Sequence, residues 1–148
     1  LSPMAFIPYL KEQLNVPIIA AGCISGGDQM LSALSLGAEV CYMGTRFIAS
    51  EECGASEDYK SLVTSATPDD IVYTDAVSGI HANFLRSTLP SEGLRSRESP
   101  HKKWRDIWSA GQGVAQVHEI KTISEIVETI IQEYHRGLSR LNALSGLA

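Results

Sequence analysis

The sequence predicts an α/β protein built from the repeating unit of a parallel sheet. Two apolar runs, residues 16–21 and residues 40–43, are each followed directly by glycine, and an amphipathic segment lies between them. Continuous apolar runs of this length are typical of parallel strands that are buried on both faces. A strand, a helix and a second strand in this order make a β/α unit, which occurs in barrels and in open doubly wound sheets alike.

Helices are predicted on both sides of the first strand. Ser2 and Pro3 supply an N-cap and a proline at the first helical position, and apolar residues then recur at helical spacing, which predicts a helix over residues 3–14. A turn rich in glycine leads to the second helix, whose apolar face contains Met30, Leu31 and Leu34. Gly37 stands where a left-handed residue is expected to end this helix.

The middle of the chain, residues 51–121, is predicted to form a loop or lid with helical pieces. Residues 70–77 are a candidate third strand outside the repeat, and the polar residues 85–103 are expected to form a loop or lid. A short helical piece is expected over residues 104–110. The glycines on either side of Gln112 then predict a turn.

The last segment, residues 122–148, is predicted to be a helix that packs on the rest of the domain. Thr122 and Glu125 form a capping box, and a regular apolar stripe follows them as far as a predicted end near Gly137. Two parallel strands can neither close a barrel nor cover their own edges. We therefore expect the chain to be a fragment or truncated product of a larger fold.

Composition and charge exclude several classes of partner. The chain has 148 residues and a formal net charge of −5, which argues against nucleic acid or an anionic membrane as the main partner. No apolar run is long enough to span a bilayer, and no secretory signal is evident. The three cysteines are odd in number and lack metal-ligand spacing, so we expect reduced thiols, no metal site and a cytoplasmic protein.

Glycines follow both predicted strands, where parallel α/β folds bind ligands. Gly22 follows the first strand and Gly44 follows the second, and neighbouring βα turns of this kind form the phosphate site of many barrels. Thr45 adds a hydroxyl donor. The alternative is that these glycines serve only tight turns. Arg46 has two interpretations as well, since it can pair with a phosphate or with a carboxylate that holds the mouth of the barrel.

Three blocks of sequence resemble the nitronate monooxygenase family, formerly called 2-nitropropane dioxygenases. In chain order they are VPIIAAGCISGGDQMLSALSLGAEVCYMGTRFIASEEC, YTDAVSGIHANFLRSTL and KKWRDIWSAGQGVAQVHEI. The resemblance covers most of the chain and implies the C-terminal portion of an FMN-binding (β/α)8 TIM barrel, with a mainly helical C-terminal extension. Residues 1–50 would then be the last β/α units and carry the FMN phosphate site.

Carried over from the family, the residues that hold the FMN phosphate are Gly22, Cys23, Tyr42, Met43, Gly44 and Thr45. Cys23 replaces the second glycine of the usual AAGGI motif. A positive φ at Cys23 would be penalised, whereas a negative φ would leave its N–H available. Tyr42 stands where the family often has glutamine, so a backbone contact would survive there and a side-chain contact would not.

The resemblance implies that the family's catalytic histidine is not among these 148 residues, so the catalytic residue stays unknown. The family's histidine lies in an AGGH-type loop that would precede Leu1. His81 and Gln112 are candidates for lining the substrate mouth, although each is also typical of an ordinary loop or turn. His101, His118 and His135 are not expected to replace the family's histidine.

The resemblance implies an oxidoreductase that uses FMN and O2 to convert alkyl nitronates to a carbonyl compound and nitrite. On its own the chain is expected to have no significant turnover, because the histidine block lies outside it. Two alternatives stand beside this function. One is an NAD(P)H-dependent FMN reductase acting on a quinone or an enoyl thioester. The other is a truncated remnant without catalysis.

Overall fold

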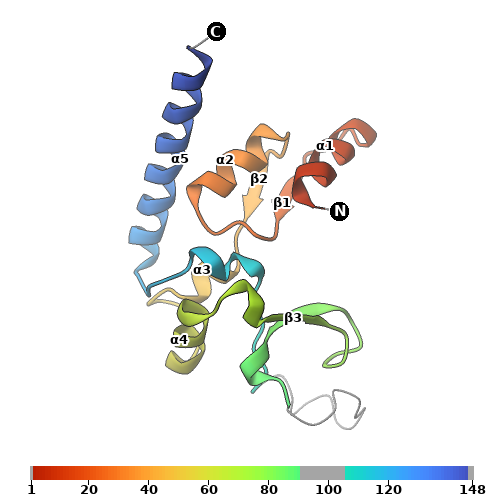
Figure 1. The fold of residues 1–148 in the computed structure, drawn as a ribbon, viewed down its shortest axis with the longest axis vertical. Coiled ribbons are helices and arrows are strands. Elements are labelled where there is room, and N and C mark those ends of the chain that lie inside the picture. Colours follow the sequence, from red (N-terminus) through yellow and green to blue (C-terminus); the bar gives the residue numbers. More distant parts are fainter. Residues whose placement is uncertain (1, 91–105, 147–148) are drawn as a thin grey trace.

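The computed structural model describes residues 2–90 and 106–146 (Figure 1). The β/α repeat comes first, followed by a helical and hairpin segment and then by one long helix. The elements are α1 Pro3–Gln13, β1 Ile19–Ala21, α2 Gly27–Ser35, β2 Val40–Tyr42, α3 Thr45–Ile48, α4 Glu57–Ser65, β3 Ile71–Thr74, β4 Ala82–Leu85 and α5 Ile123–Ser145, with 3₁₀ turns η1 Pro68–Asp70, η2 Arg86–Thr88 and η3 Gln112–Gln116.

Strands β1 and β2 pair in parallel, which confirms the predicted strand–helix–strand unit. Ile19 lies opposite Val40 and Ala21 opposite Tyr42. The prediction that both strands are buried on two faces is wrong, because Ile19, Val40 and Tyr42 are 64%, 50% and 67% exposed. Within the described residues this sheet has two strands, and α1 and α2 cover only the face that carries Ala20.

The capping and helix-ending residues in the sequence correctly predicted where the first two helices lie. Helix α1 ends at Gln13, one residue before the predicted Leu14. Helix α2 is followed by Gly37 at φ +108°, the left-handed conformation that the sequence predicted for this glycine.

The candidate third strand exists, although it belongs to a separate sheet. Strand β3 pairs with β4 in an antiparallel hairpin, and sequence analysis had placed the residues of β4 in a loop. Phe84 of β4 is fully buried and packs with Val77 and Ile107. The predicted helical piece at residues 104–110 is wrong for its described part, residues 106–110, which are not helical. Residues 91–103 of the expected lid lie outside the described residues.

Helix α5 begins at the predicted capping box and runs further than predicted. The Thr122 hydroxyl accepts from the Glu125 amide, and the Glu125 carboxylate accepts from the Thr122 amide. The predicted end near Gly137 is wrong, since α5 continues to Ser145. A Cβ on Gly137 would lie less than 3.0 Å from Asp28 and Leu31 of α2, so this glycine allows close helix packing rather than ending the helix.

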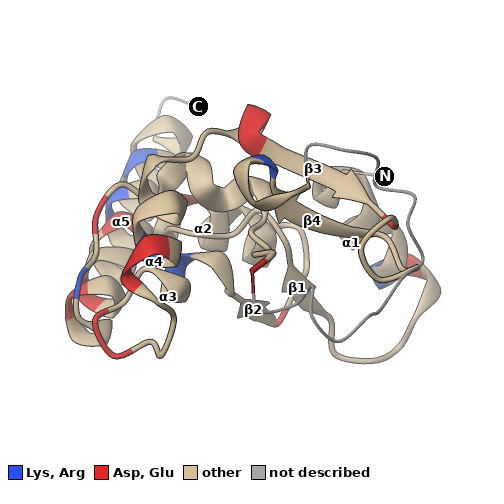
Figure 2. Cartoon of the chain, turned by 90° about the horizontal axis from the view of Figure 1, so that it is seen from below, with Lys and Arg blue, Asp and Glu red and all other residues tan. Residues whose placement is uncertain are grey.

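Helix α5 lies beside α2 in its middle part and extends beyond it (Figure 1). The two helices approach closely at Gly27, the first residue of α2. A Cβ there would lie less than 3.0 Å from the backbone of α5 at Ile130 and Tyr134. Acidic and basic positions both occur along α5 (Figure 2), so this helix is not uniformly basic. None of the helices in the described ranges is long and apolar enough to cross a membrane.

Candidate functional site

The six residues predicted to hold phosphate come together at one edge of the β1–β2 sheet. Because the strands are parallel and Ala21 pairs with Tyr42, both chains leave the sheet at the same end. Gly22 and Cys23 form a bend after β1, and Met43 and Gly44 connect β2 to α3, which begins at Thr45. These two connections, together with Thr45, are the two turns of the site. We call these two turns, together with Tyr42, the cradle.

The cradle leaves its backbone open to a ligand. A Cβ added to Gly22 or to Gly44 would meet no atom of the described residues within 4 Å, so both positions are open. Gly22 has φ +92°. Residues with a side chain rarely adopt this backbone conformation, whereas glycine adopts it without strain. The cradle therefore fits an anionic group, such as a phosphate, that approaches the backbone closely.

A distant segment orients the hydroxyl of Thr45. The backbone N–H of Gly111 donates to Thr45 Oγ1 at 2.9 Å. A threonine hydroxyl that accepts this bond still has its own proton to donate, and no acceptor for that proton is present in residues 2–90 or 106–146. The hydroxyl is thus held in place by Gly111 with its own proton left to donate. Sequence reasoning missed the role of Gly111, because the two residues lie 66 positions apart.

The same segment packs against the residues that follow Cys23. A Cβ on Gly113 would lie less than 3.0 Å from Ser25 Oγ and 3.8 Å from the carbonyl carbon of Cys23. The turn that sequence analysis predicted around Gln112 is the start of η3, and the Gln112 side chain is exposed. The glycines on either side of it provide the contacts with the cradle.

Cys23 has the strained conformation that sequence analysis named as the unfavourable case. Its φ is +58°, and no other residue with a side chain has positive φ in the described residues. A left-handed conformation costs an L-residue about 1–2 kcal/mol. The thiol is exposed at the cradle, where the family has glycine.

We expect Cys23→Gly to stabilise the chain by about 1 kcal/mol, because relief of the left-handed conformation outweighs the added freedom of the unfolded chain. Urea unfolding followed by circular dichroism measures the change. Cys53→Gly is the matched control. Cys53 has no positive φ, so the same substitution there is expected to lower the stability. Equal changes at the two positions would contradict the strain at Cys23.

Arg46 does not point to the cradle. It is 6% exposed, and its Nη1 donates to the backbone carbonyl of Glu119 at 3.2 Å. Burial lowers the pKa of Arg46, and the carboxylates of Glu119 and Glu133 partly oppose this shift. Of the two interpretations, the structure favours a role in holding the segment before α5, through a carbonyl oxygen rather than a carboxylate.

The two residues suggested for the substrate mouth are not joined to the cradle. His81 is exposed at the start of β4 and packs on the ring of Tyr73, with ring centroids 5.0 Å apart. No hydrogen bond or ring contact within the described part links His81 or the Gln112 side chain to the cradle. No group of three metal-binding side chains occurs in the described residues, and His101 lies outside them.

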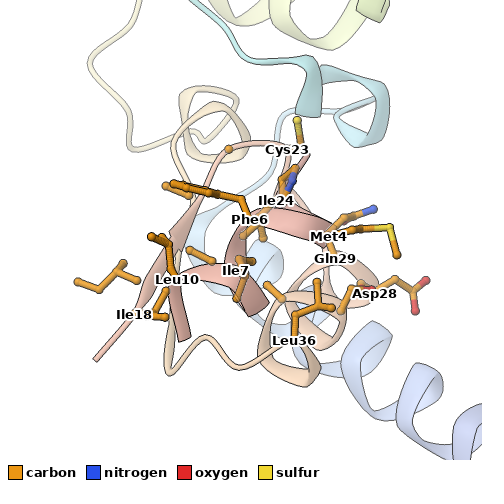
Figure 3. Close-up of a pocket in the computed structure, with 17 residues that line it drawn as sticks. Met4, Phe6, Ile7, Leu10, Ile18, Cys23, Ile24, Asp28, Gln29 and Leu36 are labelled. Carbon is orange, nitrogen blue, oxygen red and sulfur yellow. The ribbon is translucent and has the colours of Figure 1, made fainter. Parts of the chain in front are cut away.

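An apolar groove reaches the cradle from the side of α1 (Figure 3). It encloses about 540 Å³ between α1, β1 and α2, and Gly22 and Cys23 lie at its end. Met4, Phe6 and Leu10 contribute to its apolar wall. Sequence reasoning did not predict this groove.

The fold and site define a class of α/β protein in which two parallel strands end in open turns suited to an anion. A solved structure with this architecture is FabK from Thermotoga maritima, which superposes with a TM-score of 0.80 at 26% identity over 97% of this chain and 52% of that one. Nitroalkane oxidase from Streptomyces ansochromogenes has a TM-score of 0.77 at 23% identity, over 95% of this chain and 46% of that one, which shows the fold alone. The architecture is that of the C-terminal portion of a (β/α)8 TIM barrel with a helical extension, as predicted.

Comparison of the sequence with known protein families identifies the family of this chain. The model of the nitronate monooxygenase family matches residues 2–101, and the chain belongs to that family. A probable nitronate monooxygenase of Staphylococcus saprophyticus is 27% identical, over 93% of this chain and 44% of the relative. One of Staphylococcus aureus is 36% identical, over 61% of this chain and 27% of the relative. The chain thus spans less than half the length of these curated relatives.

Proposed function

We propose that this chain holds the phosphate of FMN at the cradle, as part of a barrel that oxidises alkyl nitronates with O2 to a carbonyl compound and nitrite. The observation that carries the proposal is the pair of open turns at Gly22 and Gly44, side by side at the end of two parallel strands. The family match supports the choice of FMN and of nitronates.

In this proposal the residues of the chain bind and orient the cofactor. The open backbone at Gly22 and Gly44 lets phosphate oxygens approach, and Thr45 donates a hydrogen bond from a hydroxyl held by Gly111. Tyr42 and Met43 contribute backbone atoms, because both lie where β2 ends beside the bend at Gly22. Bound FMN supplies the redox chemistry, while the protein supplies position and electrostatics.

Nitrite release from propionate 3-nitronate tests the activity. The protein encoded by the complete gene is loaded with FMN. Its nitrite release is then assayed both in air and without oxygen. Nitrite that depends on both FMN and O2 supports the proposal. For the 148 residues alone we expect FMN binding without nitrite, because the family's catalytic histidine is not among them.

The likeness to FabK favours one second candidate, a flavin-dependent reductase that takes electrons from NAD(P)H. Anaerobic mixing of the FMN-loaded protein with NADH or NADPH separates the two. Loss of the flavin absorbance with a nicotinamide, and no nitrite from a nitronate, would favour the reductase. FMN binding without either reaction would indicate a chain that has kept the cradle without catalysis.

A further inference from the structure

The start of α3 is fastened to a segment far along the chain, residues 111–121, which we call the clasp. The backbone N–H of Gly111 donates to Thr45 Oγ1 at 2.9 Å. Arg46, the next residue of α3, donates from Nη1 to the backbone carbonyl of Glu119 at 3.2 Å. The clasp therefore holds two consecutive residues of α3, and only the first of them belongs to the cradle.

The clasp has further attachments beside these two bonds. The Lys121 amide donates to the Ala49 carbonyl at 3.4 Å, and the Glu51 amide donates to the Lys121 carbonyl at 2.9 Å. Val114 and Val117 of the clasp are fully buried and pack with Ala49. The loss of a single bond is therefore expected to shift the clasp locally and not to release it.

Arg46 holds the clasp without reaching the cradle. It is 6% exposed, and it lines a polar cavity that none of the six cradle residues lines. Burial lowers the pKa of Arg46, and the carboxylates of Glu119 and Glu133 oppose that shift, so the charge of the guanidinium is compensated within the fold. A guanidinium in these surroundings supports the backbone and is not available to a phosphate at the cradle.

We propose that Arg46 is a positioning residue of the phosphate site, which acts through the clasp by keeping the Gly111 amide on the Thr45 hydroxyl. With this bond in place, the hydroxyl proton is left for a phosphate oxygen. Hydrogen bonds weaken steeply when their geometry is lost, so a displaced clasp weakens the binding of the phosphate. The inference rests on the proposed function, because it concerns how tightly the cradle holds FMN.

Flavin fluorescence titrations of Arg46→Met with FMN and with riboflavin, which lacks the phosphate, test this role. The substitution keeps an apolar stem and removes the guanidinium. We expect FMN binding to be about fivefold weaker and riboflavin binding to be unchanged. The loss is smaller than the loss expected on removing the Thr45 hydroxyl itself, because Arg46 only positions that group.

Lys60→Met is the matched control. Lys60 is 4% exposed, and its Nζ donates to the backbone carbonyl of Glu51 at 3.2 Å. It is thus a buried cation bonded to a carbonyl, like Arg46, but it lies on α4 and outside the clasp. We expect Lys60→Met to keep the FMN affinity of the parent even where it lowers the stability.

A double-mutant cycle separates positioning from a general loss of structure. If Arg46 acts through Thr45, Arg46→Met has no further effect on FMN binding in a Thr45→Val background. A loss of structure, or a direct attraction between the guanidinium and the phosphate, would weaken FMN binding equally in both backgrounds. Equal losses, or an Arg46→Met variant with the FMN affinity of the parent, would overturn the proposal.

A conservative variant and the parent chain complete the test. Arg46→Lys keeps the charge and a donor for the Glu119 carbonyl, and it is expected to retain most of the FMN affinity. Circular dichroism checks each fold, and if Arg46→Met does not fold, the cycle is run with Arg46→Gln, which is too short to reach that carbonyl. A parent chain that binds FMN and riboflavin equally would overturn the proposed function as well, whereas an FMN preference that survives in the Met or Gln variant would overturn this inference alone.

Discussion

Gly27→Ala is expected to separate α5 from α2 and to lower the free energy of unfolding by about 3 kcal/mol. The new Cβ would lie less than 3.0 Å from the Ile130 carbonyl oxygen and the Tyr134 amide nitrogen. Both are backbone atoms inside a helix, so no side-chain rotation relieves the clash. In isolation alanine favours a helix over glycine by about 1 kcal/mol, so the predicted sign is opposite to that of helix propensity.

Chemical denaturation measures this loss, and Gly54→Ala is the matched control. A Cβ on Gly54 would meet no atom within 4 Å in the part of the chain that the structure describes, and the φ of Gly54 is not positive, so we expect little change there. A Gly27→Ala variant as stable as Gly54→Ala would show that α5 does not pack on α2 in the way described.

Gly113→Ala is expected to cost about 2 kcal/mol, because it forces η3 away from the segment behind the cradle. The clash is with one atom, Ser25 Oγ, at less than 3.0 Å, whereas Ser25 Cβ would be at an ordinary 3.5 Å. Ser25→Ala removes the clashing oxygen, and this oxygen has no partner in the described residues. The double variant Gly113→Ala with Ser25→Ala is therefore expected to recover most of the loss.

Thermal unfolding is measured for the parent chain, the two single variants and the double variant. These four stabilities give the coupling free energy between positions 25 and 113. Ser25→Ala alone is expected to change the stability little. If the double variant were as unstable as Gly113→Ala, the loss would have a source other than this contact.

Local signals were sufficient to predict the β/α repeat, the left-handed Gly37 and the capping box at Thr122. Each depends on residues close together in the chain. The cradle could be proposed for the same reason, since parallel strands bring their ends together by geometry. Its openness at Gly22 and Gly44 could not be predicted, because it depends on what the rest of the fold leaves uncovered.

Predictions failed where long-range contacts override local preference. Gly137 has the signal of a helix end, yet α5 continues through it, because packing on α2 favours a residue without a side chain there. Strand β4 has only four residues and is defined by its pairing with β3. The bond from Gly111 to Thr45, which orients the hydroxyl of the cradle, had no local signal at all.

The central claim, that the cradle holds the phosphate of FMN, is tested most directly by comparing FMN with riboflavin, which lacks the phosphate. Flavin fluorescence titrations use the parent chain, Thr45→Val and Thr45→Ser. We predict that the parent prefers FMN, that Thr45→Val weakens FMN binding about tenfold without changing riboflavin binding, and that Thr45→Ser, which keeps the hydroxyl, restores it. Equal affinity of the parent chain for FMN and riboflavin would contradict the claim.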